Sequence, residues 1–269
     1  MTAATTLPVT LTALQQMKAR GEKIASLTCY DSSFTRVLES AGVEMFIIGD
    51  SLGMVLKGHE STVPVTIADM IYHAANVARV GQSALRVVDM PFMSYANPDQ
   101  ALGNAARLMG EGGAHMVKLE GGADKAAIVE YLVGHSIPVC GHIGLLPQSV
   151  HQLGGYKVQG RDEAGARALQ EDARALEQAG AGLLVLECVP AVLATRISAA
   201  VNIPTIGIGA GPGCDGQVLV LYDMLGITPG KRPRFVRDFL RDTCSVPAAI
   251  EAYVAAVKNT SFPAAEHCF

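Results

Sequence analysis

Five short apolar runs in this chain each end on an acidic residue, and this repeated pattern constrains the fold more than any other feature. The runs cover residues 26–31, 45–50, 85–89, 116–120 and 183–187, and they end on Asp31, Asp50, Asp89, Glu120 and Glu187. Apolar runs of this length, rich in valine, isoleucine and leucine, are typical of strands buried on both faces. A carboxylate at the end of such a strand needs a partner, because removing its charge from water is costly. The five strand ends are therefore predicted to converge on something cationic, as at the C-terminal rim of a parallel barrel.

Strand-like and helix-like segments alternate along the chain, and no linker separates them. The alternation predicts eight strands, the last near 217–222, and favours a single (β/α)8 TIM barrel. The predicted domain covers 1–269, with a helix over 10–20 before the first strand and a helical tail at the C-terminal end. A doubly wound α/β sheet is the alternative. It needs a Gly-x-Gly-x-x-Gly turn after an early strand, whereas the glycine cluster here, 207–213, comes late.

The composition excludes several classes of protein. Hydrophobic residues make up 49% of the chain and charged residues 17%, which allows a large core and excludes disorder. A net charge of −4 gives no electrostatic footprint for nucleic acid or an anionic membrane. No apolar stretch approaches the roughly 20 residues that cross a bilayer, and residues 1–8 lack the parts of a signal peptide. With six cysteines but no Cys-x-x-Cys pair, we expect a reduced, cytoplasmic protein without nucleic-acid or membrane partners.

Three of the acids are candidates for a metal site. Asp50 and Asp89 end adjacent predicted strands, so their carboxylates are expected to reach one ion, and Glu120 could complete the shell directly or through water. Mg²⁺ takes oxygen ligands, usually one or two carboxylates, and keeps positions for water and substrate. The alternative is that each acid pairs with a basic side chain or caps the next helix. For Asp31 this alternative is favoured, because a helix begins directly after it.

Three more side chains are expected near the mouth of the barrel. Lys118 shares a strand face with Glu120, so it can neutralise carboxylates or hold an anionic substrate, and a plain ion pair with Glu120 suits both roles. Glu187, roughly opposite the metal candidates, is expected to have a raised pKa and to act as a general base, unless it caps the following helix. His142 can donate a hydrogen bond or relay a proton, although a lone histidine in an apolar strand is more often a core residue. The glycine run 207–213 offers either backbone amides for a phosphate or a tight turn.

The chain closely resembles the ketopantoate hydroxymethyltransferase family over nearly its whole length. The motifs that carry the resemblance are Thr28-Cys-Tyr-Asp31, Gly49-Asp-Ser51, Gly58-His-Glu-Ser-Thr62, Asp89-Met-Pro-Phe92, Val117-Lys-Leu-Glu-Gly121, Gly141-His-Ile-Gly-Leu-Leu-Pro-Gln148, Leu186-Glu-Cys-Val-Pro190, Gly207-Ile-Gly-Ala-Gly211 and Cys214-Asp-Gly-Gln217. So many motifs in one order are highly specific.

The resemblance implies a barrel of the phosphoenolpyruvate/pyruvate superfamily that binds Mg²⁺ through Asp50, Asp89 and Glu120. It implies that a hydroxymethyl group passes from 5,10-methylenetetrahydrofolate to 3-methyl-2-oxobutanoate, giving 2-dehydropantoate and tetrahydrofolate in pantothenate and coenzyme A biosynthesis. Glu187 is the implied base, and the residues implied to hold the 2-oxo acid are Asp50, Ser51, Asp89 and Lys118. A homodecamer, arranged as a pentamer of dimers, is also implied.

Two other functions are kept as alternatives. One is a Mg²⁺-dependent carbon–carbon lyase of the same superfamily that acts on an acid like 2-methylisocitrate. Such a lyase is expected to carry a reactive cysteine in a flexible lid, typically Lys-Lys-Cys-Gly-His, and the corresponding loop 51–64 has no cysteine. The other is a non-catalytic barrel that senses small anions, which five convergent acids argue against.

Overall fold

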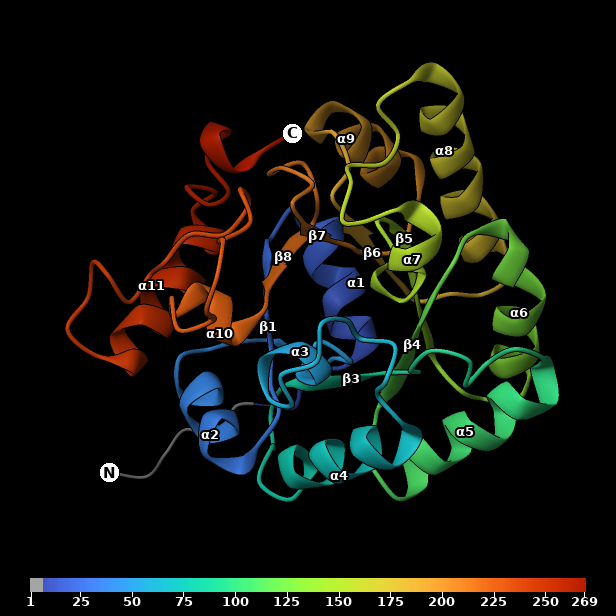
Figure 1. Cartoon of the computed structure of the whole chain (residues 1–269), viewed down its shortest axis with the longest axis horizontal. Coiled ribbons are helices and arrows are strands. Elements are labelled where there is room, and N and C mark those ends of the chain that lie inside the picture. Colours follow the sequence, from blue (N-terminus) through green and yellow to red (C-terminus); the bar gives the residue numbers. More distant parts are fainter. Residues whose placement is uncertain (1–6) are drawn as a thin grey trace.

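The computed structural model describes residues 7–269, in which eight parallel strands close into a barrel in sequence order (Figure 1). The strands are β1 (Ile24–Thr28), β2 (Met45–Ile48), β3 (Leu85–Asp89), β4 (Met116–Glu120), β5 (Val139–Gly144), β6 (Leu183–Glu187), β7 (Thr205–Ile208) and β8 (Gly216–Leu219). Pairing of β1 with β8 closes the ring. The (β/α)8 prediction is therefore confirmed, and the doubly wound sheet is excluded.

Helices surround the strands, as Figure 1 shows. They are α1 (Leu11–Ala19), α2 (Ser32–Ser40), α3 (Leu52–Val55), α4 (Ile67–Ala78), α5 (Pro98–Gly110), α6 (Ala126–Gly134), α7 (Val150–Leu153), α8 (Glu163–Gln178), α9 (Ala191–Ala200), α10 (Leu221–Met224) and α11 (Val246–Lys258), with three short 3₁₀ helices. Within residues 7–269, no helix is both long and apolar enough to cross a membrane. The expectation that 1–8 is not a signal peptide falls mostly on 1–6, which lie outside the described residues.

Three predicted strands have different limits in the structure, and one of them is β2, which ends at Ile48 rather than at residue 50. The first lies at 24–28 rather than 26–31, because the Asp31 carboxylate accepts hydrogen bonds from two backbone N–H groups of the first turn of α2, at 2.8 and 2.9 Å. The eighth ends at Leu219, since the chain turns into α10 two residues later. The capping role favoured for Asp31 is confirmed.

Alternate residues of each strand enter two different cores. Met45 and Ile47 belong to the inner cluster within the barrel, whereas Phe46 and Ile48 belong to the outer cluster between strands and helices. This division explains why the strands are continuously apolar, since both faces are buried. Leu14 and other residues of α1 join the inner cluster, so this helix closes the N-terminal end of the barrel.

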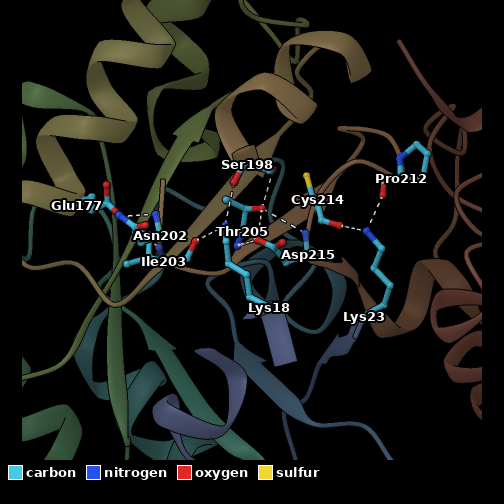
Figure 2. Close-up of polar contacts among 10 residues, drawn as sticks. All are labelled: Lys18, Lys23, Glu177, Ser198, Asn202, Ile203, Thr205, Pro212, Cys214 and Asp215. Carbon is cyan, nitrogen blue, oxygen red and sulfur yellow. Dashed lines mark hydrogen bonds and ion pairs between the residues drawn. The ribbon is translucent and has the colours of Figure 1, made fainter. Parts of the chain in front are cut away.

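Polar contacts hold α1 against the barrel (Figure 2). The Lys18 Nζ donates hydrogen bonds to the carbonyl groups of Ser198 and Ile203 and to the Asp215 carboxylate, each at 2.9 Å. Asp215 also accepts hydrogen bonds from the backbone N–H and the hydroxyl of Thr205, at 2.8 and 2.9 Å. Lys18 therefore joins α1 to β7 and to the segments beside it.

Replacing Lys18 by methionine is expected to lower the free energy of unfolding by about 2–4 kcal/mol. The change removes three hydrogen bonds and leaves a largely buried Asp215 carboxylate without its cation. Urea denaturation measures the loss. The matched control is Arg20→Met, which breaks a solvent-exposed ion pair with Glu22 and should cost about 0.5 kcal/mol or less. Equal losses for the two variants would contradict the structural role given to Lys18.

Candidate active site

The C-terminal ends of the strands surround a cavity of about 970 Å³. All the site residues predicted from the sequence line this cavity, and they are Asp50, Ser51, Asp89, Lys118, Glu120, His142 and Glu187. They come from β3 to β6 and from the loop that follows β2. The barrel therefore brings together side chains that are up to 137 residues apart in sequence, since 187 − 50 = 137.

Lys118 is the buried cation of the site. Its Nζ lies 3.1 Å from Asp89 Oδ1, and both side chains are about 5% exposed or less. The alternative of a plain Lys118–Glu120 ion pair is wrong, because the register of β3 and β4 places Asp89 directly beside Lys118. Asp89 Oδ2 also accepts a hydrogen bond from the backbone N–H of Asp50 at 3.1 Å. Asp50, Asp89 and Lys118 therefore form one connected group.

His142 lies between Lys118 and Glu187. Its Nδ1 is 3.2 Å from Lys118 Nζ, and its Nε2 is 3.2 Å from Glu187 Oε2, at an angle that does not form a hydrogen bond. Burial and the nearby Lys118 charge lower the pKa of His142 well below its usual value, so the ring is neutral at pH 7. The ring is buried, yet it is part of the site rather than of the apolar core. Its Nδ1 accepts from the ammonium, which leaves the proton on Nε2, and this proton has no acceptor in the described part of the chain.

The site has more negative than positive groups. Burial and then the Asp89 charge raise the pKa of Asp50 to about 7, and burial and Asp50 raise the pKa of Glu120 well above its usual value. Burial alone would lower the pKa of Lys118, but the charges of Asp89, Glu120 and Asp50 raise it instead. One ammonium therefore faces several carboxylates. A further cation would lower the electrostatic cost of ionising them.

The fit of a divalent ion can be judged from the buried oxygen atoms. Glu120 Oε1 is buried and accepts no hydrogen bond from the described part of the chain, and Asp89 Oδ1, which accepts none either, has only the ion pair with Lys118 at 3.1 Å. Acceptors left in this way are costly unless a ligand satisfies them, and carboxylate oxygens suit Mg²⁺. Among residues 7–269, however, no group of three or more His, Cys, Asp or Glu side chains is arranged to hold a metal ion. The donor set therefore fits an ion held by one or two carboxylates with water and substrate, and not a closed three-carboxylate shell.

Sequence reasoning gave no role to Gln148, which connects two of the acids. Its side-chain amide donates to Asp50 Oδ2 at 2.8 Å, and its backbone N–H donates to Glu120 Oε2 at 3.0 Å. Its Oε1 accepts a hydrogen bond from the Tyr95 hydroxyl at 2.6 Å. The available signal was a polar residue at the end of the 141–148 motif. The spacing of residues in the sequence could not show that the Gln148 side chain contacts Asp50, just after β2.

Two hydroxyl groups complete the polar part of the cavity. Ser51 Oγ lies 2.9 Å from the Tyr30 hydroxyl, so a second residue orients the serine. The Thr62 side chain lines the cavity, and its Oγ1 is buried without a hydrogen-bond partner in the described part of the chain. Thr62 was also missed from the sequence. An unsatisfied hydroxyl in this position can donate a hydrogen bond to a bound anion.

The glycine run 207–213 has a structural explanation. Gly209 and Gly211 have φ values of 63° and 76°, in the left-handed region that favours glycine. A Cβ on Gly209 would lie 2.9 Å from the Phe235 ring, and one on Gly211 would lie 2.4 Å from the Ala191 Cβ. The protein itself packs closely on this turn. The tight-turn interpretation is therefore favoured over a phosphate site.

The fold and the cavity define a class of protein, a (β/α)8 barrel with an acidic site at the C-terminal ends of its strands. A putative phosphonomutase from Burkholderia cenocepacia J2315 has a similar fold, with a TM-score of 0.63 and 17% identity over 80% of this chain and 94% of that one. A 2,3-dimethylmalate lyase, described as a PEP mutase/isocitrate lyase superfamily member, gives a TM-score of 0.59 at 19% identity, covering 80% of this chain and 82% of the lyase. These likenesses show the fold of the barrel.

Sequence similarity identifies the family more narrowly. The family model described as ketopantoate hydroxymethyltransferase matches residues 8–265. A 3-methyl-2-oxobutanoate hydroxymethyltransferase from Nitrosococcus oceani is 62% identical over 258 residues, which are 96% of this chain and 98% of that relative. The chain belongs to the ketopantoate hydroxymethyltransferase family. The resemblance inferred from the motifs is confirmed.

Proposed function

We propose that the protein transfers a hydroxymethyl group from 5,10-methylenetetrahydrofolate to 3-methyl-2-oxobutanoate, giving 2-dehydropantoate and tetrahydrofolate for pantothenate and coenzyme A synthesis. Family membership supports this reaction. The observation that carries the proposal is the position of Glu187, in one cavity with the Asp50, Asp89 and Lys118 group. The cavity thus combines a candidate base with groups that can hold a small 2-oxo acid.

The buried group is proposed to hold the 2-oxo acid. Asp50 and Asp89 would hold Mg²⁺, with Glu120 acting directly or through water, and the ion supplies Lewis-acid polarisation of the 2-oxo group when bound. Lys118 contributes a fixed positive charge, and Ser51 contributes a hydroxyl oriented by Tyr30. These donors bind and orient the acid so that its C3 atom faces Glu187.

Glu187 is the proposed general base. Its side chain is 14% exposed, and burial raises its pKa to about 7, which suits proton removal near neutral pH. Glu187 takes the C3 proton, and the Lys118 ammonium stabilises the negative charge that develops on the substrate. The C3 electron pair then forms a bond to the carbon carried by the folate as one of the two C–N bonds of that carbon breaks. Water replaces the second C–N bond and so supplies the oxygen of the new hydroxyl. The proton from C3 and one proton from water end on N5 and N10 of the departing tetrahydrofolate. Neutral His142 accepts a hydrogen bond from Lys118 and so helps to keep the ammonium in position.

The rate of C3 proton exchange is expected to depend on the ionisation of Glu187. The base acts only when deprotonated, so the rate should rise about tenfold per pH unit below pH 7 and level off above it. His142 is neutral at pH 7 and above, because its pKa lies well below its usual value. Deuterium uptake from D₂O, followed by NMR between pH 5 and 9, measures the profile. A rate that falls with rising pH would contradict the assignment.

Replacing Gln148 by methionine is expected to lower the transfer rate by about 10- to 100-fold. The change removes the side-chain hydrogen bonds to Asp50 and Tyr95 but keeps a side chain of similar length. The control is Gln152→Met, four residues along on an exposed site, which should leave the rate within about twofold. Steady-state assays of the two variants test the orienting role. Equal rates would show that Asp50 needs no such support.

The proposed reaction is tested by a coupled assay with 3-methyl-2-oxobutanoate and 5,10-methylenetetrahydrofolate, with and without a metal chelator. Production of 2-dehydropantoate that stops on chelation is the expected result. Cleavage of 2-methylisocitrate without hydroxymethyl transfer would instead support the lyase alternative. A protein that binds the 2-oxo acid but exchanges no C3 proton would support the sensor alternative.

The homodecamer and the cytoplasmic location are proposals that rest on the family resemblance and on the composition. A decamer of this 28.1 kDa chain would have a mass near 281 kDa, since 10 × 28.1 = 281. Light scattering after size exclusion tests this mass. A monomer or an isolated dimer at micromolar concentration would refute the assembly.

A further inference from the structure

One side of the cavity contains none of the groups assigned so far. It is formed by apolar side chains of β7, β8 and the C-terminal segment, namely Ile208, Val218, Val220, Phe235 and Phe269. Ile208 is paired in register with Glu187, and Phe235 packs against the cluster that contains Ile208 and Val218. This apolar wall therefore begins directly beside the proposed base. The cavity as a whole, at about 970 Å³, is much larger than a five-carbon 2-oxo acid needs.

The C-terminal residue is a fixed part of this wall. The Phe269 carbonyl accepts a hydrogen bond from the backbone N–H of Ala191 at 3.0 Å, which holds the chain end beside the start of α9 (Figure 1). The rings of Phe235 and Phe269 are 6.5 Å apart at an angle of 68°. The wall thus offers preordered aromatic surface, which is suited to a flat aromatic or heterocyclic ligand.

Asp223 lies at one end of the wall, on α10 just beyond β8. It is the only acidic residue that lines the cavity within 7–269, apart from Asp50, Asp89, Glu120 and Glu187. The residue is partly buried, and it also lines a smaller pocket of about 210 Å³ beneath the loop 226–233. A carboxylate at the end of an apolar slot can accept two parallel N–H groups from the edge of a heterocycle.

Two cations lie on the other side of Glu187 in strand order. Lys157 and Arg161 are in the loop between β5 and α8, line the cavity and are exposed. Neither forms an ion pair with another described residue. On the Asp223 side, Arg232 pairs with Asp238 at 2.8 Å and Arg234 donates to the backbone carbonyl of Glu266 at 2.9 Å, whereas Lys231 forms no ion pair within the described residues. Lys157 and Arg161 are therefore free to bind carboxylates of a ligand.

We infer that this wall is the folate site and that it binds the co-substrate in one orientation, a conclusion that rests on the proposed function. Asp223 accepts the N3–H and 2-amino groups of the pterin, the apolar wall covers the ring, and Lys157 with Arg161 holds the glutamate carboxylates. The transferable carbon of 5,10-methylenetetrahydrofolate bridges the pterin and the aminobenzoyl group. A molecule held at both ends in this way presents that carbon on the Glu187 side of the cavity.

The pterin end of the folate site is tested with Asp223→Asn. The KM for 5,10-methylenetetrahydrofolate should rise about 10- to 100-fold, because two charge-assisted hydrogen bonds are weakened. Exchange of the C3 proton without folate should change less than twofold, since that step needs only the 2-oxo acid site. The control, Asp242→Asn, changes an exposed acid outside the cavity and should leave both values unchanged. A KM within twofold of the unmodified protein would overturn the assignment.

A change in the ligand tests the same contact without depending on how the variant folds. A 5,10-methylenetetrahydrofolate analogue that lacks the 2-amino group should have a KM at least tenfold higher with the unmodified protein. For the Asp223→Asn variant, the KM values for the analogue and for the natural compound should differ by less than threefold. Equal use of both compounds by the unmodified protein would overturn the inference. Loss of C3 exchange in the unmodified protein would instead refute the proposed function itself.

The end of the folate site that holds the glutamate carboxylates is tested with the double variant Lys157→Gln and Arg161→Gln. Its KM should rise at least tenfold for a triglutamate form of the co-substrate, and less for the monoglutamate, because each added carboxylate increases the charge interaction. Lys231→Gln, which removes a cation on the Asp223 side of the cavity, serves as the comparison. A larger effect of Lys231→Gln than of the double variant would overturn the orientation.

Discussion

Glu187→Gln is expected to reduce C3 proton exchange by about 10²- to 10⁴-fold, while the affinity for 3-methyl-2-oxobutanoate changes little. Glutamine keeps the size and position of the side chain but cannot accept the proton. The groups that bind the 2-oxo acid, Asp50, Asp89 and Lys118, lie on β3, β4 and the end of β2, so the substitution on β6 leaves them in place. The substitution should therefore lower the rate of C3 proton exchange without a matching loss of affinity for the 2-oxo acid.

The measurement combines NMR detection of deuterium uptake with calorimetric titration of the 2-oxo acid. A suitable control is Glu171→Gln on the exposed surface of α8, which should alter neither quantity. Exchange within tenfold of the unmodified rate would remove Glu187 from the role of base. A parallel loss of exchange and binding would show that Glu187 helps to hold the substrate.

The double variant Asp50→Ala with Asp89→Ala is expected to lose Mg²⁺ dependence together with affinity for the 2-oxo acid, and its transfer rate should fall on the order of 10³-fold or more. The two carboxylates are the proposed ligands of the ion. Without Asp89, the buried Lys118 ammonium also loses its nearest counter-ion. Activity titrations with Mg²⁺ and equilibrium binding of the acid measure both effects.

Because an unpaired buried lysine destabilises the fold, the double asparagine variant, Asp50→Asn with Asp89→Asn, is the companion experiment. It keeps the side-chain volume, and circular dichroism checks that the barrel is intact. The exposed pair Asp99→Ala and Asp242→Ala controls for loss of two negative charges. Tight binding of the 2-oxo acid by either site variant in the absence of metal would refute the chelation scheme.

The strands and the site-lining residues were predictable because one physical rule governs both. A strand buried on both faces is continuously apolar, so a charged residue marks its end, as at Asp89, Glu120 and Glu187. Parallel strands then bring such ends to the same side of the sheet. Asp31 followed a different rule, because its carboxylate caps a helix.

Contacts between strands and across the cavity could not be predicted in the same way. The partner of Lys118 depends on the stagger between β3 and β4, which a single sequence does not display. Gln148 reaches Asp50 because the loop after β5 folds back over the barrel end. Thr62 lies on a connecting segment and Asp223 lies on the short helix α10, and the positions of both depend on the packing around them. The pattern of residues within a strand does not predict where the residues outside the strands lie.

The closure of the barrel base by α1 has a kinetic consequence. The group around Asp50, Asp89 and Lys118 is 5% exposed or less, whereas Lys157 and Arg161 lie at the open rim. Under the proposed function, a small acid that enters by this rim would have to arrive before the bulkier folate covers its route. Turnover would then follow a compulsory sequence, in which tetrahydrofolate departs first and the newly made keto acid leaves last.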